Sequence, residues 1–98
     1  MSANKIRWLN SGTFESFRKS LGYINLSYNK IQILWARTFI NFTSLRNIYL
    51  DSNQIKVIQP GVFVNLSVLS QLDLSDNKCR IFPSSRDLST LRSLYISG

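Results

Sequence analysis

Few side chains of this chain could carry out acid–base, nucleophilic or metal chemistry. The 98 residues include five Asp and Glu, one Cys and no His, so one copy of the chain cannot assemble a His-based triad or a His/Cys zinc site. Asp51, Asp73 and Asp76 come closest to a carboxylate cluster, but a hard cation needs several oxygens that converge on it. Solvated acids are the interpretation that we favour. We therefore expect no catalytic residue, no metal site, no cofactor and no enzymatic activity.

Asparagine recurs at a fixed interval and marks an internal repeat. Asn29, Asn53 and Asn77 lie 24 residues apart. Apolar residues stand at the same offsets before each of them: Leu21, Ile24 and Leu26, then Leu45, Ile48 and Leu50, then Leu69, Leu72 and Leu74. Asn4 opens the back half of an earlier copy. The period predicts one domain with a partial repeat at 1–20, repeats at 21–44, 45–68 and 69–90, and a partial repeat at 91–98.

Each repeat contains a segment that alternates apolar and polar residues, as a half-buried strand does. These segments are Ile24-Asn25-Leu26, Ile48-Tyr49-Leu50, Leu72-Asp73-Leu74 and Leu94-Tyr95-Ile96. We expect them to stack as parallel neighbours. An inward-pointing Asn donates and accepts hydrogen bonds at once and can satisfy backbone groups left unpaired where the chain leaves the strand. We therefore predict a structural asparagine ladder formed by Asn4, Asn29, Asn53 and Asn77. Cys79 takes the place of Ile31 and Ile55, which favours a buried small hydrophobe over a reactive thiol.

The spacing L-x-x-L-x-L-x-x-N-x-L, at a period of roughly 20–29 residues, resembles the leucine-rich repeat family. Ile or Leu five places after the Asn, and Phe ten places after it, resemble the extracellular animal type, which includes Toll-like receptors and neuronal and matrix proteins. The resemblance implies an α/β fold: a right-handed solenoid with about four short parallel strands on the concave face. The convex connections would be mostly irregular or short helical. We interpret the chain as a horseshoe fragment with uncapped ends, at which copies could self-associate end to end.

What the resemblance implies about function is recognition without catalysis. The chain would be part of a receptor ectodomain, most similar to a Toll-like receptor, that binds a protein or a microbial ligand on its concave face. A structural or adhesive protein of the matrix or the synapse is one alternative, and a cytosolic scaffold of the same fold is another. The sequence does not name the ligand.

The polar strand positions form a candidate binding face. Tyr, Asn, Ser and Asp without a large aliphatic residue are typical of recognition surfaces, because Tyr provides contact area at low entropy cost. Any parallel strand, however, needs polar residues on its solvated side. Ser27 and Ser75 belong to the same face. The candidate ligand-binding residues are Tyr23, Asn25, Asn47, Tyr49, Asp51, Gln71, Asp73 and Tyr95.

Basic residues give the chain a net charge of +7 and also recur with the repeat. Lys5, Lys30 and Lys78 directly follow the recurring Asn, and three residues after it stand Arg7, Lys56 and Arg80. A stripe at the coil spacing could follow a polyanion, as phosphate contacts do on nucleic acid. A solvated flank that keeps the array soluble is the interpretation that we favour.

Three Asn-x-Ser/Thr triplets begin at Asn25, Asn41 and Asn65 and have the form of glycan acceptors. Asn41 and Asn65 occupy equivalent places in their repeats, whereas a glycan on Asn25 would obstruct the strand face. The triplets favour a secretory-pathway parent, so that the chain would lie on the extracellular side of a membrane receptor or be secreted. No apolar segment of signal-peptide or membrane-span length occurs in the sequence.

Overall fold

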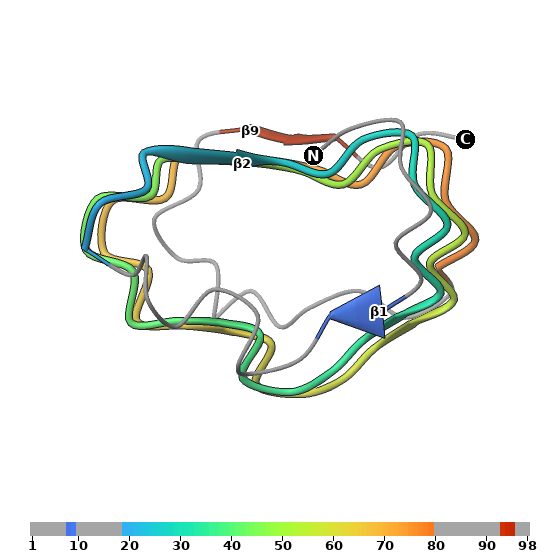
Figure 1. The fold of residues 1–98 in the computed structure, drawn as a ribbon, viewed down its shortest axis with the longest axis horizontal. Coiled ribbons are helices and arrows are strands. Elements are labelled where there is room, and N and C mark those ends of the chain that lie inside the picture. The colour runs from blue at the N-terminus through green and yellow to red at the C-terminus, as the bar shows by residue number, and fades with distance from the viewer. Residues whose placement is uncertain (1–7, 10–18, 80–92, 96–98) are drawn as a thin grey trace.

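The computed structural model describes residues 8–9, 19–79 and 93–95. Within these residues the chain forms parallel strands and no helix. The strands are β1 (Trp8–Leu9), β2 (Tyr23–Asn25), β3 (Ile33–Leu34), β4 (Phe39–Ile40), β5 (Asn47–Tyr49), β6 (Val57–Ile58), β7 (Phe63–Val64), β8 (Gln71–Asp73) and β9 (Ser93–Tyr95). Figure 1 shows successive coils lying over one another around a shared interior. The predicted leucine-rich repeat solenoid is confirmed.

The main sheet has the strand order β2-β5-β8-β9, with every pair parallel. Tyr23, Asn47 and Gln71 pair in register, and so do Asn25, Tyr49 and Asp73. Because alternate strand residues point to opposite faces, this register places Ile24, Ile48 and Leu72 together in the interior, where all three are buried. The polar residues between them remain on the outer face of the sheet.

The return side of the coils contains strands as well, wherever the structure describes it. β1, β3 and β6 form one sheet, and β4 pairs with β7. Mostly irregular or short helical connections were expected here; the described part of the chain has short strands joined by irregular segments and no helix. The reason lies in the side chains: Ile33 pairs with Val57 and Phe39 with Phe63, and β-branched and aromatic residues suit a pleated, half-buried surface.

The core lies between the main sheet and the return strands. Leu26, Leu50 and Leu74 are at most 2 % exposed. Phe39 and Phe63 stack across neighbouring coils with ring centroids 5.5 Å apart and an interplanar angle of 5°. Burying such side chains contributes about 1.5–3 kcal/mol each. Since one coil alone buries few of them, stacking the coils supplies the core. No helix of the described segments is long and apolar enough to cross a membrane.

Candidate recognition surface

Asn53 connects two coils through four hydrogen bonds. Its Nδ2 donates to the carbonyl oxygens of Leu26 (3.0 Å), Leu50 (3.0 Å) and Asp51 (3.2 Å). Its Oδ1 accepts from the backbone N–H of Ile31 at 3.1 Å. Leu26 and Ile31 belong to the preceding coil, so this one buried side chain binds the end of its own strand and the turn of its neighbour.

Asn77 makes the same contacts one coil further on. Its Nδ2 donates to Leu50, Leu74 and Ser75, and its Oδ1 accepts from the N–H of Ile55 at 3.0 Å. Asn29 donates to Leu26 at 2.8 Å and to Ser27 at 3.2 Å. Asn4 lies outside the described residues. Among the described residues, no buried side-chain nitrogen or oxygen lacks a hydrogen-bond partner. The ladder therefore fixes the point at which each strand leaves the sheet.

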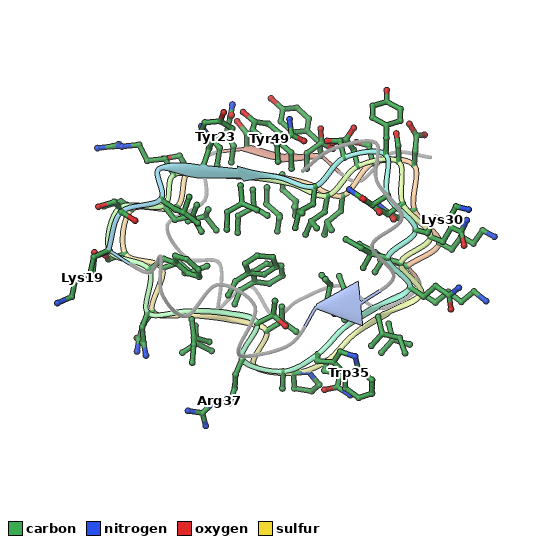
Figure 2. The ribbon with its side chains drawn as sticks, in the orientation of Figure 1. Lys19, Tyr23, Lys30, Trp35, Arg37 and Tyr49 are labelled. Atoms are coloured by element: carbon green, nitrogen blue, oxygen red, sulfur yellow. The ribbon has the colours of Figure 1, made fainter. Side chains whose placement is uncertain are left out.

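The outer face of β2, β5, β8 and β9, together with Ser27, Asp51 and Ser75, which lie two residues beyond β2, β5 and β8, is called the strand face below. Figure 2 shows Tyr23 and Tyr49 projecting from this face, away from the interior. One row across the strands contains Tyr23, Asn47, Gln71 and Ser93, and the next contains Asn25, Tyr49, Asp73 and Tyr95. Tyr23, Asn25 and Tyr95 are exposed, and the candidate binding residues that are half-buried are Asn47, Tyr49, Asp51, Gln71 and Asp73.

Ser27 does not belong to the exposed part of this face, contrary to the expectation from the sequence. It is buried, and its Oγ donates to Asp51 Oδ1 at 2.5 Å. The two residues lie 24 positions apart, so this hydrogen bond joins adjacent coils. Ser27 therefore helps to fix the position of the Asp51 carboxylate. The only signal in the sequence was a Ser and an Asp in equivalent places of adjacent repeats.

Asp51 and Asp73 stand in different rows. Asp73 lies beside Tyr49 and Tyr95, whereas Asp51 is bound by Ser27. In the described part of the chain, no group of three or more His, Cys, Asp or Glu residues could hold a metal ion. The two carboxylates of this face each accept a separate hydrogen bond, Asp51 from Ser27 Oγ and Asp73 from the N–H of Ser75.

Two residues of the second row make the same turn. Asp73 Oδ1 accepts from the N–H of Ser75 at 3.0 Å, and Asn25 Oδ1 accepts from the N–H of Ser27 at 3.1 Å. Asn and Asp side chains form such local bonds readily at turns. The amide of Asn25 and the carboxylate of Asp73 thus form the same hydrogen bond at the turn, so this bond does not require a charge.

The leucine-rich repeat family profile matches residues 1–55 and 43–98, which together cover the whole chain. The chain belongs to the leucine-rich repeat family. No curated protein matches the chain. Leucine-rich repeats stack into extended surfaces on which partners bind, and the family is typically non-enzymatic. Membership therefore indicates a protein-binding module.

The basic flank of this leucine-rich repeat runs along the turns that follow the strands. Lys30, Lys56 and Lys78 are exposed, and Figure 2 shows Lys30 pointing away from the coil. Backbone bonds of 2.9 Å from Lys56 N–H to Gln32 and from Lys78 N–H to Ile55 hold the turns in register. Lys5, Arg7 and Arg80 lie outside the described residues. Three successive coils thus each present one lysine on this flank.

Asn41 and Asn65 follow β4 and β7 on the return side. Both are exposed, with φ of 60° and 55°, and Asn65 Nδ2 donates to Asn41 Oδ1 at 3.0 Å. Asn is among the few residues that adopt the left-handed region readily. The fold therefore has its own reason for Asn at these positions, which the sequence pattern alone did not indicate.

Cys79 packs against the edge of the core and is half-buried. Burial raises the pKa of its thiol, while a hydrogen bond involving its own backbone acts in the opposite direction. A raised pKa means less of the nucleophilic thiolate at neutral pH. Cys79 therefore packs against the core of the third repeat as a half-buried residue, and not as the fully buried one that the sequence predicts.

Proposed function

We propose that the chain is a recognition module whose strand face binds a protein or microbial ligand, within the ectodomain of a receptor of the Toll-like kind. The observation that supports this proposal is the exposure of aromatic rings on a hydrogen-bonded parallel sheet: Tyr23 is 61 % and Tyr95 49 % exposed. A face that only needed solvation would require no tyrosine. Tyrosine contributes large contact area at low entropy cost, and a preformed sheet lowers the cost of ordering on binding.

A photo-crosslinking comparison tests the role of the strand face. Tyr23 and Trp35 are both exposed aromatics on different sides of the coil (Figure 2). Either can be replaced by benzoylphenylalanine, aromatic for aromatic, so each variant is the control for the other. The proposal predicts that the probe at Tyr23 forms a defined covalent adduct with the bound ligand. An excess of chain without the probe should reduce the amount of this adduct. Equal adducts from both probes, or adducts from Trp35 alone, would contradict it.

We further propose an extracellular location with glycans on Asn41 and Asn65. Both are exposed and follow the paired strands β4 and β7, so glycans there would leave the strand face free. Expression behind a secretion signal, followed by mass analysis, tests this: we expect added mass at both residues and none at Asn25, whose triplet ends in buried Ser27. Unmodified Asn41 and Asn65 would favour the cytosolic scaffold.

A structural or adhesive role in the matrix or the synapse would use the same strand face. The sequence that flanks this chain in the native gene separates the two roles, because a signalling domain after a membrane span would favour the receptor. Copies of the chain could also associate end to end, and this is a separate proposal. Sedimentation of the chain at increasing concentration measures it directly.

A further inference from the structure

We infer that the strand face binds an arginine side chain of a protein partner in the row formed by Tyr49, Asp73 and Tyr95. This inference rests on the proposed function, because it specifies what the strand face recognises. The three residues belong to β5, β8 and β9 and are called the Tyr–Asp–Tyr row.

The backbone register determines the arrangement. Tyr49 pairs with Asp73, and Asp73 pairs with Tyr95. Neighbouring strands lie about 4.8 Å apart, so one carboxylate stands between two aromatic side chains that are roughly 10 Å apart at their backbones. All three side chains are at least partly accessible. A planar cation bound to Asp73 would therefore lie between two tyrosine side chains of the same row.

The charge of the row differs from that of the whole chain. The chain has a net charge of +7, yet the described positions of the strand face include Asp51 and Asp73 and no Lys or Arg. Arg46 precedes β5, at the opposite strand end from Asp51. The strand face is thus complementary to a cationic group, whereas the described flank with Lys30, Lys56 and Lys78 would repel one.

The chemistry favours arginine over lysine. Guanidinium stacks on aromatic faces and binds carboxylates in a bidentate manner. Asp73 Oδ1 already accepts the N–H of Ser75, which orients the carboxylate in advance. A carboxylate has about four lone-pair sites in total, so acceptor capacity remains for a guanidinium.

Asn25 supplies the design of the test. It occupies the same row as Asp73 and makes the same turn bond. Asp73→Asn should therefore keep the turn and remove only the charge. Asp76→Asn is the matched control, since Asp76 is exposed, lies outside the row and has a φ of 56° that Asn tolerates. Equal unfolding midpoints for the two variants would establish that both fold normally.

Displayed random peptides, selected on the full chain, serve as the probe. The variant Gln71→Trp places a bulky side chain in the row beside the Tyr–Asp–Tyr row and should block the strand face. We expect arginine in those peptides that bind the original chain but not this variant. These peptides should bind Asp73→Asn roughly tenfold more weakly and Asp76→Asn unchanged, since charge-assisted bonds and stacking each contribute. Replacing the peptide arginine with citrulline, or Tyr95 with Ala, should cause losses of similar size, and these two readouts do not depend on the folding of Asp73→Asn.

The outcomes separate the inference from the proposed function. Peptides that need the strand face but contain no arginine, or that bind Asp73→Asn as well as the original chain, would overturn the inference and leave strand-face recognition in place. Peptides that bind Gln71→Trp as well as the original chain would contradict both.

Discussion

At the scale of single residues, the asparagine ladder shows how a polar group stabilises an apolar core. Asn53 is 7 % exposed, and burying an amide without partners costs several kcal/mol. Here its donors and its acceptor are all used, and they satisfy backbone groups of two coils at once. The side chain is therefore a connector between coils and not a ligand-binding group.

Replacing Asn53 with Leu should lower the free energy of unfolding by about 3 kcal/mol or more, because several buried backbone groups lose their partner. Denaturant unfolding measures this change. Asn41→Gly removes an exposed Asn–Asn bond but tolerates the φ of 60° at this position, so it should cost less than about 1 kcal/mol. Equal midpoints for Asn53→Leu and the original chain would contradict the ladder.

Cys79 gives a prediction on pH. Because burial raises the pKa of its thiol, iodoacetamide should label the folded chain several-fold more slowly at pH 8 than the chain in denaturant. Raising the pH increases the thiolate fraction, so the two rates should converge in alkaline solution. Equal rates at pH 8 would show that the thiol is neither buried nor shifted.

At the scale of elements, the coils are joined by backbone bonds on every side. Leu50 N–H donates to Asp73 in the main sheet at 2.8 Å, and Phe39 N–H donates to Val62 on the return side at 2.9 Å. Between these sheets lie the stacked rings of Phe39 and Phe63. Packing and backbone pairing thus repeat with the same period.

Phe63→Ala should lower the free energy of unfolding by about 3–5 kcal/mol, because it removes a buried ring and leaves a cavity against Phe39. Phe63→Leu keeps most of the volume and should cost less than about 1.5 kcal/mol. Chemical denaturation of both variants measures the difference. Similar losses for Ala and Leu would mean that the ring does not fill the space between the coils.

The main sheet could be predicted from the sequence because alternation and the interval of 24 residues both point to it. The inward position of Asn53 followed from its place in an apolar run. The interval of 24 residues places Ser27 beside Asp51 and Asn41 beside Asn65, but it could not reveal the two hydrogen bonds, because these depend on side-chain orientation. The left-handed conformations of Tyr28 and Ser52 were missed too, because neither residue type favours them. The β4–β7 pairing was missed because two-residue strands leave too short a pattern.

At the scale of the whole molecule, charge is divided between surfaces. The strand face includes Asp51 and Asp73, while Lys30, Lys56 and Lys78 occupy the flank. Both faces follow from the same stacking, because a residue type that recurs in each repeat forms a stripe along the stack. A cationic partner should therefore favour the strand face, and an anionic partner should favour the lysine flank.

Heparin chromatography tests whether the flank is a binding site or only a solvated surface. We expect a Lys30, Lys56 and Lys78→Gln triple variant to elute at the same salt concentration as a control with Lys19, Arg37 and Arg46→Gln. Both remove three charges, and dispersed solvated charges contribute equally. Elution of the flank variant at markedly lower salt would instead support a polyanion site.

The strand face can act as a recognition surface only if the coils are stacked through the ladder, and NMR of the asparagine side chains tests this most directly. The Nδ2 protons of Asn53 should exchange slowly with water. They should also show nuclear Overhauser contacts to the backbone near Leu26, 27 residues earlier in the chain. Fast exchange and no contact across coils would contradict the stack and, with it, the recognition surface.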